Sequence, residues 1–157
     1  MSYNENRALG NLKSIHQAQE VFRETDRDQN GKNAYASFYI HLWQAVDDTG
    51  EVVPVNLISR NLAFAMGPSR EINGYYFKDI HFRFDDQGRE VLLDPEKEWA
   101  LTAVPVQMGL TGRFIFLIDQ KGGVYVKMAY EAPDIFPYDP ISSGWVLVKD
   151  KIDMDAL

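Results

Sequence analysis

Cysteine is absent from the 157-residue sequence, and this absence excludes several kinds of site. Without cysteine the chain forms no disulfide, has no thiolate nucleophile and offers no thiolate ligand to zinc. Long apolar runs are also missing: stretches such as Phe114 to Ile118 have only the length of a strand, whereas a membrane-spanning helix needs about 20 apolar residues. The polar start, Met1 to Asn6, lacks the basic and then apolar pattern of an export signal. We therefore expect a chain that stays where it is made, or one whose targeting segment has been removed.

Positive charge is scarce. The 16 Lys and Arg residues are outnumbered by 23 Asp and Glu residues, which gives a formal net charge of −7. Nucleic acids and anionic membrane surfaces attract proteins that have a basic patch. The acidic balance therefore predicts no nucleic-acid partner and no adsorption to an anionic membrane, while it suits solubility and cation binding.

Helical periodicity is confined to the first half of the chain. The spacing of apolar residues predicts a helix from Glu5 to Glu24, capped by Asn4. A second helix is predicted from Ala34 to Val46, and a third, short one from Asn56 to Met66. The apolar stripe of the first helix consists of Ala8, Leu12, Ile15, Ala18 and Phe22.

After Gly74 the periodicity changes to that of strands. Tyr75 to Phe84 alternates, except for a slip at Lys78-Asp79 that predicts a β-bulge. Pro105 places its strand near a sheet edge, and the Pro-rich segment Ala132 to Ser143 is predicted as a loop. The other predicted strands are Trp99 to Met108, Phe114 to Ile118, Val124 to Met128 and Trp145 to Val148. Hairpin turns are predicted at Asp85 to Gly88 and Asp119 to Gly123.

Helices followed by strands are typical of the α+β class. We predict a single domain over residues 1–157, in which the long N-terminal helix packs on an antiparallel β-meander. This arrangement buries the apolar stripe of the helix and one face of the sheet together. No internal repeat, low-complexity tract or linker divides the sequence.

Three blocks of sequence resemble, in the same order, bacterial type IV pilin-like and type II secretion pseudopilin-like proteins. The first is the helical run from Ala8 to Gln19, which leads into a turn rich in Asp and Gly. The second is the aromatic strand Tyr75 to Lys78, preceded by Gly74. The third is a closing hairpin from Pro105 to Tyr125. The family's long apolar N-terminal segment and its processing site do not occur in this sequence.

The resemblance implies a pilin-like head with a structural role, as an assembly subunit of a bacterial pilus or secretion apparatus. Its partners would be other pilin-like subunits or secretion-apparatus proteins. Its place would be the bacterial cell envelope, in the periplasm or at the cell surface. It would be anchored in the inner membrane before assembly if the full-length protein has an N-terminal apolar helix. The alternative is a soluble module on the same fold that binds a peptide or glycan, with or without calcium.

The strongest candidate site is the turn that follows the first helix. Asp26, Asp28 and Asn30 are oxygen-bearing residues at alternating positions before Gly31, as at the opening of a calcium loop. We predict these three residues as metal ligands and calcium as the candidate ion. The twelfth loop position, where an EF-hand has a bidentate Glu, is Ser37, so the sequence favours a shorter and weaker calcium turn over a standard EF-hand. The same residues also suit a plain helix stop, in which Asp and Asn side chains satisfy backbone N–H groups.

No constellation typical of an enzyme is found. Acidic pairs such as Asp47-Asp48 and Asp85-Asp86 suit solvated turns better than glycoside hydrolysis. A second acidic cluster, Asp134 and Asp139, lies in the Pro-rich loop and is predicted to be solvated. The three histidines, His16, His41 and His81, fall on different predicted elements and lack metal-ligand spacing. We therefore predict no catalytic site and no enzymatic activity.

Overall fold

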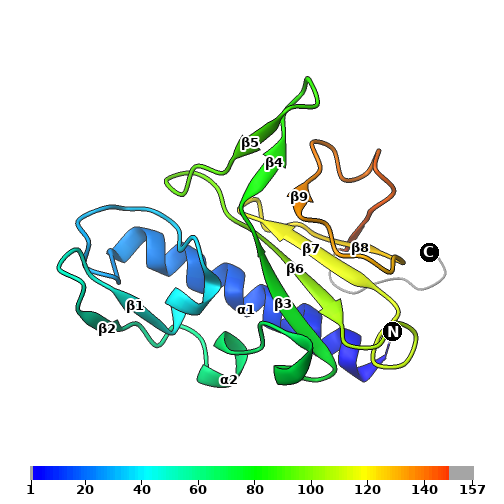
Figure 1. Ribbon diagram of the computed structural model, residues 1–157, viewed down its shortest axis with the longest axis horizontal. Helices are drawn as coiled ribbons and strands as arrows, with labels where there is room; N and C mark the ends of the chain where they lie inside the picture. Colours follow the sequence, from blue (N-terminus) through cyan, green and yellow to red (C-terminus); the bar gives the residue numbers. More distant parts are fainter. Residues whose placement is uncertain (1, 149–157) are drawn as a thin grey trace.

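A long helix, α1 (Tyr3–Thr25), begins the computed structural model, which describes residues 2–148 (Figure 1). Its cap is Ser2 rather than the predicted Asn4. The Ser2 Oγ accepts the Glu5 N–H at 3.2 Å, and the Ser2 N–H donates to Glu5 Oε1 at 3.2 Å. The Asn4 side chain instead donates to the Thr111 carbonyl oxygen at 3.0 Å. The start of α1 is thereby held by its own cap and by the loop that contains Thr111.

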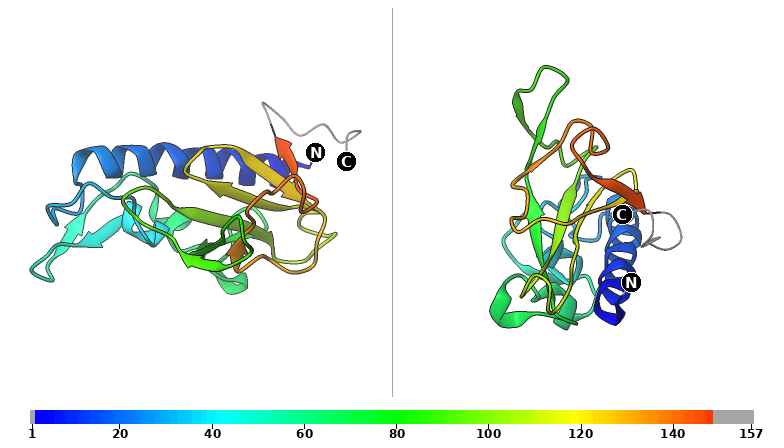
Figure 2. Two further views of the ribbon diagram at one scale, coloured as in Figure 1. Left: turned by 90° about the horizontal axis from the view of Figure 1, so that it is seen from above. Right: turned by 90° about the vertical axis from the view of Figure 1, so that its right-hand side faces the viewer.

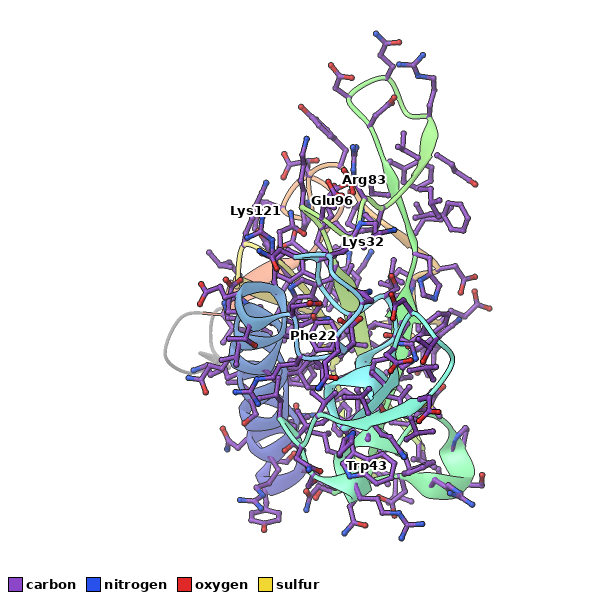
Figure 3. All side chains as sticks on the ribbon, turned by 90° about the vertical axis from the view of Figure 1, so that its left-hand side faces the viewer. Phe22, Lys32, Trp43, Arg83, Glu96 and Lys121 are labelled. Carbon is purple, nitrogen blue, oxygen red and sulfur yellow. The ribbon has the colours of Figure 1, made fainter. Side chains whose placement is uncertain are left out.

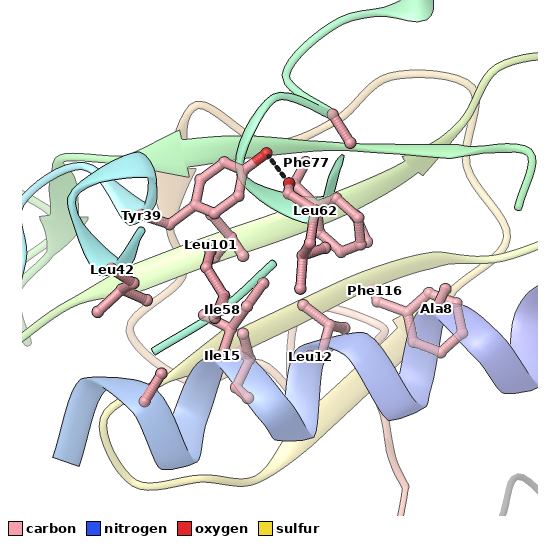
Figure 4. Packing of buried hydrophobic residues seen from close by; sticks show 14 of the residues in the cluster. Ala8, Leu12, Ile15, Tyr39, Leu42, Ile58, Leu62, Phe77, Leu101 and Phe116 are labelled. Carbon is pink, nitrogen blue, oxygen red and sulfur yellow. Dashed lines mark hydrogen bonds between the residues drawn. The ribbon is translucent and has the colours of Figure 1, made fainter. Parts of the chain in front are cut away.

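The predicted apolar stripe of α1 is buried along its whole length. It lies along one face of the main sheet (Figure 2). In the close view, Leu12 and Ile15 point from the helix into a core that also contains Ile58 and Leu101 (Figure 4). The opposite face of α1 is polar and solvent-exposed. The helix therefore uses its apolar surface within its own domain.

The segment after α1 contradicts the predicted helix from Ala34 to Val46. The Gln19 side chain accepts the Ala36 N–H at 2.8 Å and donates to the Ala36 carbonyl at 2.9 Å, which holds this backbone in a non-helical conformation. Residues 44–54 form a hairpin whose turn contains Asp47 and Asp48, directly after the predicted end of the helix. The elements are the 3₁₀ helix η1 (Tyr39–Leu42), β1 (Gln44–Val46) and β2 (Val52–Pro54). The prediction was wrong because tertiary hydrogen bonds override the helical spacing of apolar residues.

Only the centre of the predicted third helix, Asn56 to Met66, is helical. Asn56 has a φ of 57°, a left-handed conformation that cannot start a helix. The single turn α2 (Arg60–Ala63) begins after Ser59, whose hydroxyl accepts the Leu62 N–H at 3.2 Å. A short 3₁₀ helix, η2 (Pro68–Arg70), leads into the sheet.

Five antiparallel strands form the main sheet, in the order β10-β8-β7-β6-β3. Their bounds are β3 (Tyr75–Ile80), β6 (Ala100–Pro105), β7 (Ile115–Asp119), β8 (Val124–Lys127) and β10 (Val146–Val148). The strands predicted in these regions are confirmed, except that the predicted strand Tyr75 to Phe84 divides at His81, so that its last residues belong to a second sheet. The hairpin turn between β7 and β8 is also confirmed. The α+β class, with one long helix and antiparallel sheets, is confirmed as well.

Two details of the predicted strands are wrong. No bulge interrupts β3, because its pairing with β6 runs without a break from Tyr75 to Ile80. The apparent slip arises because Asp79 occupies a core-facing position, where its carboxylate accepts the Tyr39 N–H at 3.0 Å. Pro105 lies in an interior strand rather than at an edge. It is tolerated there because the pairing of β6 with β7 ends at Ala103, so no ladder bond is lost.

A second, smaller sheet has the order β5-β4-β9. It consists of β4 (Phe82–Phe84), β5 (Glu90–Leu92) and β9 (Ile135–Phe136), which runs parallel to β4 within the predicted loop. The predicted hairpin turn from Asp85 to Gly88 joins β4 to β5. This β4–β5 arm, residues 82–92, projects from the body of the domain (Figures 1 and 2).

Both faces of the main sheet are covered. One face packs against α1 and residues 35–65. The other face packs against the segment after β8, through Phe136 and Trp145. Within residues 2–148, no helix is both long enough and apolar enough to cross a membrane.

Candidate functional site

Two cavities lie at the foot of the β4–β5 arm and share one wall. One has a volume of about 240 Å³ and the other of about 270 Å³. The shared wall consists of Leu93, Glu98, Trp99 and Ala100. Because Ala100 begins β6, each cavity has the rigid main sheet on one side and the arm on the other. We call the first the polar cavity and the second the apolar cavity, after the residues that complete their linings.

An ion pair crosses the polar cavity. The Arg83 Nε, on the arm, lies 2.6 Å from Glu98 Oε2, and the other carboxylate oxygen of Glu98 accepts the Asp94 N–H at 3.1 Å. Both partners are partly shielded from solvent. Arg83 and Lys121 both line the polar cavity, and both lie in the half of the domain from which the arm projects (Figure 3). Glu98 therefore ties the arm to the loop that leads into β6.

Asp119, at the end of β7, also lines the polar cavity. Burial raises the pKa of its carboxyl group, although the Lys121 N–H, which donates to Asp119 Oδ1 at 3.1 Å, and the Lys121 charge both lower it. The nearby Glu98 charge raises it further. Burial raises the pKa of Tyr125, and the negative charges of Asp119 and Asp139 raise it further, which favours the neutral phenol. The polar cavity thus combines fixed charges, hydroxyl groups and flat rings, a lining suited to holding a small polar ligand.

The apolar cavity is lined mainly by hydrocarbon and rings. Phe38 is 48% exposed, and its ring centre lies 4.9 Å from that of His81 and 5.6 Å from that of His41. Leu92, at the end of β5, and Pro95 form the side of the cavity nearest the arm. This lining has the size and character to take an apolar side chain of a partner.

The predicted calcium ligands come together at the end of α1. Asp26 has a left-handed backbone and its Oδ2 accepts the Gly31 N–H at 3.1 Å. The Asn30 side chain donates to Asp28 Oδ2 at 2.9 Å and accepts the Lys32 N–H at 2.9 Å. These hydrogen bonds are the ones expected of a plain helix stop, the alternative interpretation of this turn in the sequence analysis.

Two carboxylate oxygens of this turn take no part in the hydrogen bonds of the helix stop. The remaining oxygens, Asp26 Oδ1 and Asp28 Oδ1, are both buried and have no hydrogen-bond partner among the described residues. Burial and the neighbouring Asp26 carboxyl group raise the pKa of Asp28. No three His, Asp or Glu side chains within residues 2–148 are grouped so as to hold a metal ion. A calcium ion here would therefore rely on two carboxylates with amide and backbone oxygens, and the site stays a prediction.

A comparison with protein-family models matches residues 1–145 to the family described as "Protein of unknown function (DUF2950)". The chain belongs to the DUF2950 family. The match includes α1, the main sheet up to β8, the arm and both cavities. No curated protein and no solved structure matches the chain.

The other candidates from the sequence are dispersed in this DUF2950 domain. Asp134 pairs with Lys78, whereas Asp139 accepts the Ile141 N–H at 3.2 Å within its own turn, so each has a separate partner. Two of the three histidines, His41 and His81, contact Phe38 rather than each other. Both observations agree with structural roles for these residues.

The cavities were missed by reasoning from the sequence. Arg83, Glu98 and Asp119 come from three separate segments, and the sequence analysis places Arg83 in a strand and Asp119 in a hairpin turn. No spacing in the sequence relates them, because only the pairing of β6 with both β3 and β7 brings these segments together. The unbalanced acidity of residues 85–98 was the only local signal.

Proposed function

We propose that this domain is a non-enzymatic subunit that acts through contacts with other proteins, as pilins and pseudopilins do in a pilus or secretion apparatus. The observation that carries the proposal is the β4–β5 arm. It projects from the body, and its cross-strand pair Phe82 and Leu92 is 42% and 65% exposed. Exposed apolar side chains that lie side by side can contribute to a contact surface for another protein.

The pilin-like part of the proposal is supported by the resemblance of three sequence blocks and by the order of the elements. One long N-terminal helix precedes the strands and lies along an antiparallel sheet. We accordingly propose the bacterial cell envelope as its location and other pilin-like or secretion-apparatus proteins as its partners. An anchor in the inner membrane belongs to this proposal only if an apolar segment precedes the helix in the full-length protein.

We also propose that the domain catalyses no reaction. The charged groups of the polar cavity are engaged within the fold, since Glu98 holds Arg83 and the Asp94 N–H, and Asp119 holds its own turn. A general acid or nucleophile must instead be directed at a substrate.

Photo-crosslinking tests the proposed function. A photoreactive amino acid is placed at Leu92 on the arm and, as a control, at Gln17 on the exposed face of α1. In the bacterium that encodes the protein, we expect position 92 to crosslink to an envelope protein and position 17 to give no product. If position 92 gives no product either, the arm is not a contact surface and the proposal is wrong.

The polar cavity favours a second candidate function, binding of a small polar ligand such as a saccharide. Its volume of about 240 Å³, its rings and its hydroxyl groups suit one or two sugar units. A saccharide array probed with the wild type and with Tyr138→Ala tests this candidate. Binding that the variant loses would support it, and an empty array would contradict it.

A further inference from the structure

The outer edge of β5 has no partner strand within residues 2–148. In this part of the chain, β5 pairs with β4 only. The Leu93 N–H donates to the His81 carbonyl at 2.8 Å, and the Asp85 N–H donates to the Arg89 carbonyl at 2.9 Å. Hydrogen-bonded and non-bonded pairs alternate in antiparallel strands. The N–H and C=O groups of Glu90 and Leu92 therefore point away from β4.

This edge has the form of a template for another strand. An exposed edge presents free backbone groups with which an extended segment can pair, and charge along the edge disfavours segments of the same charge. Here the edge is short and solvent-facing, and it leads at Leu92 directly into the apolar cavity. An added strand would place one of its alternate side chains in the cavity beside Phe38 and Pro95.

The charge along the edge decides which partner fits. Residues 85–98 contain six acidic and two basic residues. Arg89 pairs with Asp85, and Arg83, which precedes this stretch, pairs with Glu98, while the second basic residue of the stretch, Lys97, is exposed. The acidic residues that remain are Asp86, Glu90, Asp94 and Glu96, all of them exposed. A second copy of this chain would place like charges side by side, whereas a basic segment would find complementary charge.

We propose that the β5 edge and the apolar cavity together bind an extended, basic segment of a partner protein, which adds as a strand to β5 and inserts one apolar side chain into the cavity. This inference rests on the proposed function, that the domain acts through protein contacts. Arg23 of α1 donates to the Glu96 carbonyl at 2.9 Å. Its positive charge therefore lies beside Glu96, at the C-terminal end of the acidic stretch. The attraction for a basic segment is therefore greatest at Glu90 and Asp94.

A capped peptide of alternating residues, acetyl-Lys-Val-Lys-Val-Lys-Val-Lys-amide, is the probe. The peptide is titrated into the isotope-labelled domain, and the amide signals are followed by NMR. We expect the amide chemical shifts of Glu90 and Leu92 to change most. Two control peptides separate charge from backbone pairing. One has Glu in place of every Lys, and the other carries N-methyl groups on the residues whose N–H groups would face β5. We expect neither to bind, and added salt should weaken binding of the basic peptide.

Two variants and one matched control locate the site. Leu92→Pro removes an outward N–H without removing a bond to β4, and Glu90→Lys reverses a charge on the edge. We expect the first to weaken peptide binding about tenfold or more and the second to weaken it clearly. Glu51→Lys makes the same charge change on the other hairpin, where Glu51 is equally exposed, and should leave binding unchanged. Amide spectra of the remaining residues confirm that each variant is folded.

Equal binding of the acidic and basic peptides, no binding of the basic one, or signal changes away from β5 would each overturn the inference. A domain that dimerises, and that Leu92→Pro returns to a monomer, would show that the edge pairs with a second copy instead. A crosslink at position 92 without peptide binding would keep the proposed function and reject the basic strand. Peptide binding at β5 without any crosslink in the cell would keep the site and reject the proposed function.

Discussion

Asp26 and Asp28 place two unpaired, buried carboxylate oxygens in one turn. Two such oxygens repel each other unless a proton or a cation lies between them. The pKa of Asp28 is raised because burial and the Asp26 carboxyl group both favour its protonated form. The turn is therefore stabilised locally by its hydrogen bonds and destabilised by its charges.

The first prediction concerns calcium at this turn. With two carboxylates and no bidentate Glu, we expect a dissociation constant on the order of 10⁻⁴–10⁻³ M. A hundredfold excess of calcium should then stabilise the native state by about 2.7 kcal/mol. In thermal melts, the wild type should unfold at a higher temperature in calcium than in chelator.

Asp28→Asn should abolish that difference and, in chelator at pH 8, should unfold at a higher temperature than the wild type because the repulsion is removed. Asp47→Asn is the control, since Asp47 also accepts backbone N–H groups in an acidic turn. It should retain the calcium response. Identical wild-type melts in calcium and in chelator would show that the turn is a helix stop alone.

Asp79 gives rise to the second prediction, on pH. Burial raises the pKa of its carboxyl group to about 7, although the Tyr39 N–H lowers it. In the unfolded chain this group titrates near 3.8. Between these two pH values the native state binds more protons than the unfolded state, so its contribution to the free energy of unfolding falls as pH rises. The loss is complete only above the folded pKa.

Asp79→Asn keeps an acceptor for the Tyr39 N–H and removes the titration. We expect it to raise the free energy of unfolding at pH 8 by about 1–4 kcal/mol and to change it little at pH 4. Urea denaturation at the two pH values measures this. Asp134→Asn, at an exposed ion pair with Lys78, should show no such gain. A wild type and an Asp79 variant with parallel pH dependence would contradict the prediction.

At the scale of single elements, α1 packs its apolar stripe into the core on one face of the main sheet. Ile15 is fully buried between the helix and the sheet. Replacing it with Ala removes buried methyl groups and leaves a cavity, which typically costs about 2–5 kcal/mol. The third prediction is that Ile15→Ala lowers the free energy of unfolding by this amount in chemical denaturation.

Lys13→Ala, on the exposed face of the same helix, provides the matched control and should change stability by at most about 0.5 kcal/mol. If both variants were equally stable, the stripe of α1 would not be packed against the sheet as described.

At the scale of the whole molecule, the two clusters of buried residues lie on opposite faces of one sheet. Neither face can lose its cover without exposing the same strands to water. The fourth prediction is that the chain behaves as one domain and unfolds in a single cooperative transition.

Two tryptophans report on the two faces separately. Trp99 lies in the cluster beneath α1, and Trp145 lies in the cluster on the opposite face. With Trp43 and one of these two replaced by Phe, each single-reporter protein should show the same denaturant midpoint. A lower midpoint for Trp145 would mean that the cover of the second face opens independently.

Much of the fold can be predicted from the sequence because local physics decides it. The 3.6-residue period of apolar residues defines α1, and the alternating or continuous apolar runs from Tyr75 onward define the strands of the main sheet. The Asp- and Gly-rich turns lie where they were predicted, because their conformations depend on a few neighbouring residues. The α+β class follows from the order of these elements.

The tertiary structure decided the rest. Residues 34–46 have helical spacing, yet the Gln19 side chain and the pairing of β1 with β2 hold them in another conformation. Pro105 is tolerated in an interior strand only because the neighbouring pairing stops short of it. The cavities at the foot of the arm depend on segments far apart in the chain. Their residues become neighbours only when strands pair. The sequence alone therefore determined α1, the strands of the main sheet and the turns, whereas packing determined residues 34–46 and the site.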